Sequence, residues 1–237
     1  MTASPDRRAG ADRRGPILAF DTATTVAVVA LGRADGTLLA EDHWIAGYRH
    51  GEELLIRIDW LLARAGVGLA GLGAIVVGTG PGAFTGLRVG LATAKGLAHG
   101  LAIPLVGIPT RLALLAAARG DGARSGEPVV LMPAGPTDRI LIDPRGEASL
   151  VPGGLEPELD ASWTAVAIDL PGRASAAAAA RGNLIRARLG TALLAIGAER
   201  LERGQPSDLA TLVPEYVTLP RGVREESGAM AWSRDPS

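Results

Sequence analysis

Cysteine is absent from this 237-residue chain, and aromatic residues, lysine and net charge are all scarce. Without cysteine the chain forms no disulfide, holds no thiolate nucleophile and builds no cysteine-based zinc or iron–sulfur site. Aromatic residues make up only 3%, so the core expected from 47% hydrophobic residues must consist of Ala, Leu, Val and Ile. Lys95 is the only lysine, and a net charge of −1 gives no reason to expect direct affinity for nucleic acid.

Long apolar segments are missing as well. No apolar run reaches the roughly 20 residues that cross a bilayer, and residues 1–15 lack the apolar stretch of a signal peptide. Asp6 and Asp12 halve the charge of the arginines in this segment. We therefore expect residues 1–15 to be a disordered extension, and the chain to be cytoplasmic with no membrane contact.

The first half of the chain alternates between strand and helix patterns. Short apolar runs predict strands, and apolar residues at helical spacing predict amphipathic helices. The predicted strands are 17–20, 26–31, 37–41, 74–77 and 103–107, and the predicted helices are 51–65, 85–99 and 110–118. An antiparallel start followed by alternating strands and helices is typical of an α/β lobe with a mixed sheet. We place this N-terminal lobe at residues 16–109.

The second half is less regular. Two short predicted strands, at 129–132 and 139–142, repeat the strand–turn–strand opening and hint at a duplication. Residues 144–160 look irregular because they hold several proline, glycine and acidic residues. A strand over 164–168 and helices over 174–181 and 187–203 follow. We place a divergent C-terminal lobe at 110–219 and a mobile tail at 220–237.

The most informative segment is Gly78–Gly90, a glycine-rich turn between a predicted strand and a predicted helix. Glycines at 78, 80 and 82 permit compact or left-handed backbone, and Thr85 supplies a capping hydroxyl. The N–H groups at such a helix start bind an anion or a group of another protein. The segment is neither a P-loop, because no Gly-Lys-Ser/Thr closes it, nor a regular dinucleotide fingerprint. A phosphate loop, a packing turn and a protein interface all stay open at this point.

Three polar residues, Asp21, Thr22 and Thr24, follow the first predicted strand. In actin-like ATPases such a position binds metal and phosphate, whereas in a simple hairpin turn these side chains satisfy backbone groups. A helical metal site is not indicated, because no two histidines have i,i+4 spacing; they are His43, His50 and His99. Serine catalysis has no support either, because no Gly-x-Ser-x-Gly motif is present.

Small residues recur every fourth position of the 85–99 helix, at Gly86, Gly90 and Ala94. Each glycine costs roughly 1 kcal/mol relative to alanine inside a helix, so the spacing predicts that another backbone approaches closely. The approaching element is either this chain's own 51–65 helix or a second subunit, for which the two helices would form a flat surface.

The segment Gly80–Gly90 resembles the signature of the TsaB (YeaZ) family, within the glycoprotease-like (peptidase M22-like) superfamily. The family's usual form is Gly-Pro-Gly-Ser-Phe-Thr-Gly-Leu/Val-Arg-Ile/Val-Gly, and this chain shows only small-for-small or aliphatic exchanges. Further segments match in the same order: 17–24, His50 with 53–55, 103–110, 214–217 and 231–232. The resemblance is strong over about residues 16–118 and weak in the middle of the second half.

This resemblance implies an α/β fold of the actin-like ATPase or ribonuclease H-like type, with two small lobes and mixed sheets. It implies a non-catalytic subunit that binds and supports a TsaD-like catalytic subunit in the N6-threonylcarbamoylation of adenosine 37 in tRNA. A TsaE-like ATPase would join the complex, tRNA would be contacted only indirectly, and the isolated chain would form a homodimer. No cofactor is expected for this chain alone, whereas ATP, Mg and a metal are expected in the partner complex.

The resemblance also implies roles for particular residues. Those expected at the interface are Gly82, Phe84, Thr85, Gly86, Arg88, Val89, Gly90 and Ala94. Those expected to form a vestigial nucleotide-binding site are Asp21, Thr22, Thr24, Gly80 and Gly82. No residue of this chain is expected to be catalytic or to bind a metal.

One segment departs from the family pattern. The family commonly has Asp-Ala-Arg after the first strand of the second lobe, where this chain reads Met132-Pro133-Ala134-Gly135. Two other functions stay open. A stand-alone actin-like ATPase would use Asp21 and the glycine loop. A metallopeptidase is disfavoured, because the His-x-x-x-His metal motif of TsaD is absent.

Overall fold

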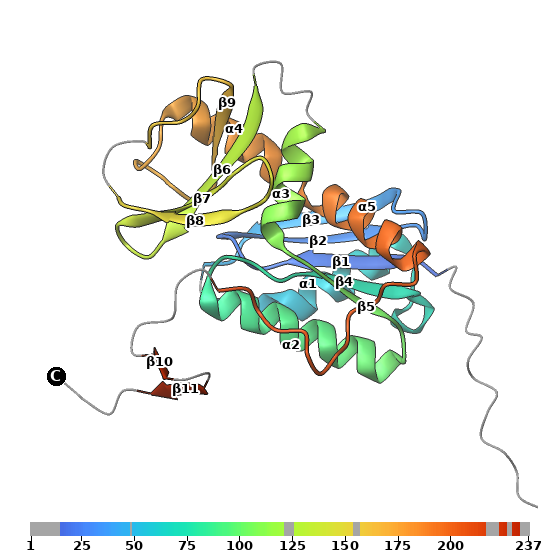
Figure 1. The fold of residues 1–237 in the computed structure, drawn as a ribbon. Coiled ribbons are helices and arrows are strands. Elements are labelled where there is room, and N and C mark those ends of the chain that lie inside the picture. Colours follow the sequence, from blue (N-terminus) through green and yellow to red (C-terminus); the bar gives the residue numbers. More distant parts are fainter. Residues whose placement is uncertain are drawn as a thin grey trace, which may run out of the picture.

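A five-stranded mixed sheet forms the larger part of the fold (Figure 1). The computed structural model describes residues 15–47, 49–120, 126–153, 157–216, 223–226 and 229–232. The strands of this first sheet are β1 (Ile17–Asp21), β2 (Val26–Gly32), β3 (Leu38–Ile45), β4 (Ala74–Gly78) and β5 (Leu105–Ile108). Their spatial order is β3-β2-β1-β4-β5, with antiparallel pairing from β3 to β1 and parallel pairing from β1 to β5.

Helices cover both faces of the first sheet. On one face lie α1 (His50–Ala65) and α2 (Phe84–Leu101), with the 3-10 turn η1 (Leu69–Gly71) after α1. On the other face lies α5 (Leu189–Glu202), which packs beside α3 (Thr110–Arg119). The residues of β1 alternate accordingly: Leu18 and Phe20 face α1 and α2, and Ile17 and Ala19 face α5. Burial on both faces explains why β1 and β4 are continuous apolar runs.

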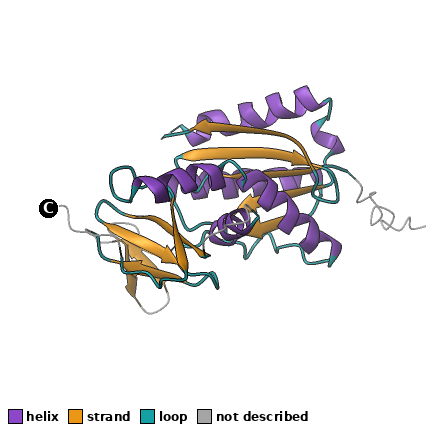
Figure 2. Ribbon diagram, turned by 90° about the horizontal axis from the view of Figure 1, so that it is seen from above, coloured by secondary structure: helices purple, strands orange, loops and turns teal. Residues whose placement is uncertain are grey.

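The second sheet has four strands in the order β8-β7-β6-β9. They are β6 (Glu127–Ala134), β7 (Asp138–Ile142), β8 (Ala148–Val151) and β9 (Trp163–Ala167). The helix α4 (Ala176–Arg186) packs on β9, and α3 packs on the opposite face against β6 (Figure 2). One buried apolar cluster extends from the first sheet through α5 and α3 to β6 and β7. The two sheets therefore share a core.

The strand β8 differs from the sequence expectation, which treated 144–160 as irregular. Ala148–Val151 pairs antiparallel with β7 at the edge of the second sheet and is half exposed. An edge strand of this kind needs no continuous apolar run, so the sequence carries no clear signal for it.

After α5 the chain returns to the first sheet, where residues 205–216 run beside β5. The Ser207 N–H donates to the Leu105 carbonyl at 2.7 Å, and the Glu215 N–H donates to the Thr79 carbonyl at 2.7 Å. Both α5 and this segment follow the second sheet in sequence yet pack on the first. The division of lobes at residues 109 and 110 stays a prediction.

The two chain ends lie largely outside the described residues. The predicted extension is described only at Gly15, and the predicted tail only in β10 (Val223–Glu226) and β11 (Ala229–Trp232), which pair antiparallel. Among the described residues, no helix combines the length and apolar character that crossing a membrane requires.

Candidate functional site

The predicted site residues gather where β1 and β4 end side by side. Asp21 is the last residue of β1, and Gly78 is the last residue of β4. Because the two strands are parallel neighbours, the turn after β1 and the glycine loop after β4 meet at one edge of the sheet. In open α/β sheets this carboxyl edge is the usual place for a ligand.

Asp21 is buried, and both of its carboxylate oxygens have partners inside the chain. The Ala23 N–H donates to Oδ1 at 2.7 Å, and the Thr110 hydroxyl donates to Oδ2 at 2.7 Å. The Thr110 oxygen in turn accepts from the Gly80 N–H at 2.9 Å. Burial raises the pKa of Asp21 above its usual value, and the bonds from Thr110 and Ala23 offset part of that rise. The carboxylate thus connects β1, the glycine loop and the first residue of α3.

Glycine is required at Gly78 because of this carboxylate. A Cβ atom at that position would lie 1.8 Å from Oδ2 of Asp21. Gly80 has φ +103°, and a Cβ there would lie 2.8 Å from the Glu215 carbonyl oxygen. Gly82 packs on the β1–β2 turn, where a Cβ would lie 2.1 Å from the Ala23 carbonyl oxygen. The three glycines therefore serve close packing within the chain.

The two threonines of the β1–β2 turn are also buried and bonded internally. The Thr22 hydroxyl donates to the Gly86 carbonyl at 2.7 Å, and the Thr24 hydroxyl donates to the Val26 carbonyl at 2.7 Å. Opposite Thr22 lies Gly90, whose Cβ would be 2.3 Å from the Thr22 oxygen. The residues predicted as a vestigial nucleotide-binding site do come together, and their observed hydrogen bonds are made within the chain, to the β1–β2 turn, β2, α2 and α3.

The residues predicted as an interface divide between two faces of α2. Gly86, Gly90 and Ala94 are buried on the face that packs against β1 and β4. At Gly90 the close approach that the small residues predicted is made by this chain's own Thr22 turn and not by α1. Thr85 and Arg88 are exposed on the opposite face, and Gly82, Phe84 and Val89 are partly exposed.

Phe84 stands at the start of α2 between an aromatic ring and a guanidinium group. Its ring centroid is 5.3 Å from that of Tyr216, and the Arg88 guanidinium carbon is 3.7 Å from the Phe84 centroid. Glu215 binds Arg111 of α3 at 2.7 Å, and the other terminal nitrogen of Arg111 donates to the Gly146 carbonyl. The segment from Pro214 to Tyr216, part of the 214–217 match to the family pattern, therefore contacts both the glycine loop and the start of α2.

Sequence reasoning expected α1 and α2 to form a flat surface for a second subunit but named no interface residue on α1. Leu54 is buried, but Leu55, Ile56 and Trp60 are 54%, 67% and 45% exposed. The Arg64 guanidinium covers part of the Trp60 ring at 4.6 Å from its centroid. The sequence did contain a signal for this face, because the helix has more large apolar residues than can pack on the side that faces the sheet. We call Leu55, Ile56 and Trp60 the outer α1 face.

In the second sheet, the departure from the family pattern lies at the end of β6. The turn between β6 and β7 contains Gly135 at φ +77°. The Arg173 guanidinium donates to the carbonyls of Thr137 and Asp138 at 2.6 and 2.7 Å, and more weakly to that of Gly135 at 3.4 Å. The carbonyl groups of this turn thus face a cation, an arrangement suited to packing rather than to holding phosphate.

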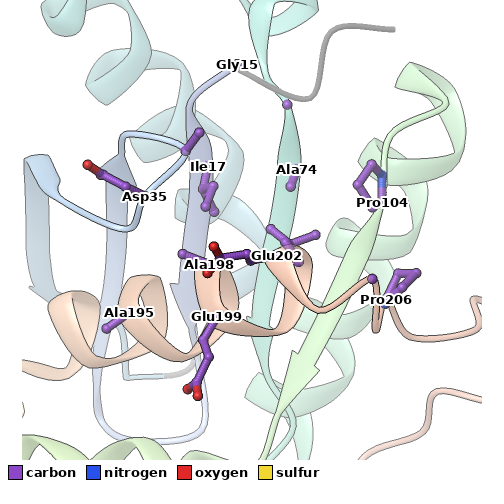
Figure 3. A pocket seen from close by; sticks show the side chains of 14 residues that line it. Gly15, Ile17, Asp35, Ala74, Pro104, Ala195, Ala198, Glu199, Glu202 and Pro206 are labelled. Atoms are coloured by element: carbon purple, nitrogen blue, oxygen red, sulfur yellow. The ribbon is translucent and has the colours of Figure 1, made fainter. Parts of the chain in front are cut away.

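A cavity of about 770 Å³ lies at the opposite edge of the first sheet (Figure 3). It is bounded by the starts of β1 and β4, the β2–β3 turn and the C-terminal half of α5. Its lining is mostly apolar, with Asp35, Glu199 and Glu202 as the charged residues. The strand β1 separates this cavity from Asp21, so the cavity is not part of the predicted site.

Within the described ranges, no group of three or more His, Asp or Glu side chains lies close enough together to hold a metal ion. Asp21, predicted for a vestigial nucleotide-binding site, accepts a hydrogen bond from a protein group on each of its oxygens.

Comparison with known proteins gives consistent matches. A family model described as TsaD, tRNA N6-adenosine threonylcarbamoyltransferase, matches residues 44–161. The tRNA threonylcarbamoyladenosine biosynthesis protein TsaB of Escherichia coli is 37% identical over 115 residues, which are 48% of each chain. TsaB of Haemophilus influenzae is 41% identical over 103 residues, which are 43% of this chain and 42% of that protein. The chain thus spans about half the length of the curated relatives it matches.

A solved structure described as YeaZ from Pseudomonas aeruginosa superposes with a TM-score of 0.60. The match covers 86% of this chain and all of that chain at 24% identity. The paired mixed sheets and the polar turn after β1 define an α/β protein with the actin-like ATPase fold, as predicted. More specifically, its curated matches include proteins named TsaB and its structural match is to a YeaZ protein, which supports the resemblance to the TsaB (YeaZ) family found in the sequence.

Proposed function

We propose that this chain is a non-catalytic TsaB-like subunit of tRNA threonylcarbamoyladenosine biosynthesis. It binds a TsaD-like catalytic subunit and supports it in the N6-threonylcarbamoylation of adenosine 37 in tRNA. The observation that carries the proposal is the sequence match to proteins named for this pathway, together with a TsaD-type family model whose matched residues, 44–161, include α1, α2 and the glycine loop.

The outer surface of α1 and α2 is suited to docking. The outer α1 face exposes three large apolar side chains, of which Ile56 and Trp60 are one helical turn apart. Large exposed apolar groups gathered on one helix are typical of protein–protein contacts. Arg88, exposed at the start of α2, adds a positive charge that fits an acidic group on the partner. We propose this surface for the TsaD-like subunit, and for a second copy of this chain when the partner is absent.

The lack of a catalytic role is supported by the state of the polar residues. Asp21 is buried with both oxygens occupied, and the threonines beside it donate to backbone carbonyls. These groups are buried and hydrogen-bonded within the chain, so none of them is exposed to a substrate in solution. We propose that the catalytic metal and ATP with Mg belong to the complex with the TsaD-like and TsaE-like partners, and that tRNA is contacted only through it. Such a complex would work in the cytoplasm.

The alternative function, a stand-alone ATPase, differs from the proposed one in a testable way. It requires the purified chain, without any partner, to bind ATP at the β1–β2 turn and the glycine loop. Calorimetric titration of the isolated chain with Mg-ATP distinguishes the two functions, because the subunit proposed here gives no binding heat without its partner.

The direct test is co-purification with the TsaD protein of the same organism. We expect a complex with the wild-type chain, and loss of that complex in the double variant Ile56→Arg with Trp60→Glu. Both positions are exposed, so the substitutions leave the core intact. Arginines at Gly86 and Gly90 would instead enter the packed core and unfold α2, so they do not test docking.

The matched control is Leu150→Arg with Leu184→Arg, two exposed apolar residues of the second sheet and α4 at 52% and 60% exposure. This control should keep the complex and the circular dichroism spectrum of the wild type. Absence of a complex with the wild-type chain, with the TsaE-like ATPase and nucleotide present, would reject the proposal. A complex that survives the α1 double variant would keep the partner but move the docking surface elsewhere.

A further inference from the structure

An inter-sheet contact centred on Asp169 is explained neither by the shared core nor by the proposed function. Asp169 follows β9 in the second sheet, and its side chain is only 6% exposed. Its backbone has φ +56°, a left-handed conformation that, glycine aside, Asp adopts more readily than most residues.

Three donors converge on the Asp169 carboxylate. The Thr25 N–H donates to Oδ2 at 2.6 Å, and the Thr25 hydroxyl donates to Oδ1 at 2.5 Å. Arg186, from the end of α4, donates to Oδ1 at 2.5 Å and is itself oriented by Asn183 at 2.5 Å. Bonds of this kind to an ionised and largely buried carboxylate are among the stronger polar contacts in proteins.

The contact joins two segments that are 144 residues apart. Thr25 belongs to the β1–β2 turn of the first sheet, whereas Asp169 and Arg186 belong to the second sheet and its helix. The sheets are also joined by the apolar cluster through α3 and α5. An apolar contact is not directional and permits small rotations, whereas three short hydrogen bonds fix an orientation.

The same turn is attached on its other side to the start of α2. The Ala83 N–H donates to the Ala23 carbonyl at 2.7 Å, and the Thr22 hydroxyl donates to the Gly86 carbonyl. The turn from Thr22 to Thr25 therefore lies between α2 and Asp169, bonded to both.

We infer that Asp169, with Arg186 and Thr25, is a latch that sets the angle between the two sheets and is able to open while the apolar core stays intact. In the closed state it holds the β1–β2 turn in place. In the open state the second sheet rotates about the apolar contact, and the N–H and hydroxyl of Thr25, an exposed residue, lose their hydrogen-bond partner. This inference does not depend on the proposed function.

The variant that isolates the latch is Asp169→Gly. It removes the carboxylate, and glycine adopts a positive φ without strain, so the backbone is not penalised. The matched control is Asp160→Ala. Asp160 accepts from the N–H and hydroxyl of Ser162 at 2.8 and 2.6 Å, the same pair of donors, but within one exposed turn of the second sheet.

The first measurement is the distance distribution between spin labels on Asp59→Cys in α1 and Leu150→Cys in β8. Because the chain contains no cysteine, only these two positions are labelled. We expect one narrow distribution for the wild type and for Asp160→Ala, and a broadened or displaced one for Asp169→Gly.

The second measurement is amide hydrogen exchange. In Asp169→Gly the Thr25 amide should exchange at least about tenfold faster, while the Ala83 amide, bonded to Ala23 in the same region, keeps its rate. General destabilisation would accelerate both amides. If Asp169→Gly does not fold, Thr25→Val removes one of the three donors and should broaden the label distance to a smaller degree. An unchanged distance distribution in a folded variant would overturn the inference.

Discussion

Gly90 provides the sharpest quantitative test of how α2 packs. Gly90→Ala should gain roughly 1 kcal/mol of helix propensity. Against this, the new Cβ would lie 2.3 Å from the buried Thr22 hydroxyl oxygen. Threonine is stiff about χ1, and rotating it away breaks the 2.7 Å bond to the Gly86 carbonyl. Overpacking costs about 1–3 kcal/mol, and the lost buried hydrogen bond adds about 1 kcal/mol. The net effect should be a loss of about 1–3 kcal/mol in the free energy of unfolding.

The effect should reverse when Thr22 is shortened. In Thr22→Ala the hydroxyl is gone, and the distance from the new Cβ to the Cβ of residue 22 is 3.6 Å, an ordinary contact. Gly90→Ala in that background should then stabilise by up to about 1 kcal/mol. Urea unfolding of the four proteins of this double-mutant cycle gives the coupling energy directly.

A control lies in the same helix. Gly96 has nothing within 4 Å of its hypothetical Cβ, so Gly96→Ala should stabilise by about 0.5–1 kcal/mol in any background. If Gly90→Ala stabilises the wild-type chain as much as Gly96→Ala does, the packing described here for α2 on the β1–β2 turn is wrong.

Three further predictions concern the site and the core. Burial raises the pKa of Asp21 in the folded state above the unfolded pKa of 3.8. The protonated carboxyl group therefore favours the folded state below pH 3.8, and this contribution to stability is lost as the pH rises through the folded pKa. The stability of Asp21→Asn relative to wild type should therefore increase with pH above 3.8 in urea unfolding, and a difference independent of pH would contradict this. Leu54→Ala should cost about 2–5 kcal/mol, whereas Leu55→Ala, its exposed neighbour, should change thermal stability little; equal losses would contradict the assigned faces of α1. Glu215→Gln should lower stability by up to about 1 kcal/mol through the lost ion pair with Arg111, and the loss should shrink in high salt.

Much of the first sheet could be predicted from the sequence. Local patterns predicted these elements, namely the apolar runs of β1 and β4 and the helical periodicity of α1 and α2. Such patterns can be recognised without knowing which contacts the elements make. The glycine loop was recognisable for the same reason, because closely spaced glycines report a backbone that side chains would obstruct. The edge strand β8 was missed, since half-exposed strands lack such a pattern.

The partners of the site residues were not predictable. The small residues Gly86, Gly90 and Ala94 predicted that another element packs closely against α2, and the sequence left two candidates, α1 and a second subunit. At Gly90 the neighbour is the Thr22 turn, because the pairing of β1 with β4 brings that turn onto α2. Likewise, Asp21 looked available for a ligand until its pairing with Thr110, 89 residues away, was known.

The amino-acid sequence by itself gave the resemblance to the TsaB (YeaZ) family through the motif at Gly80–Gly90. It also determined the α/β class and most of the places where helices, strands and a tight glycine turn form, because these depend on short-range periodicity and local backbone freedom. Only the tertiary structure decided which polar groups are occupied and which surfaces stay exposed. The Asp21 carboxylate accepts a hydrogen bond from Thr110, and the Asp169 carboxylate accepts one from Thr25. The side chains of Ile56 and Trp60 are exposed on the surface. The physical reason is that such contacts join residues distant in sequence, and burial or exposure of a side chain is set by the whole packed chain.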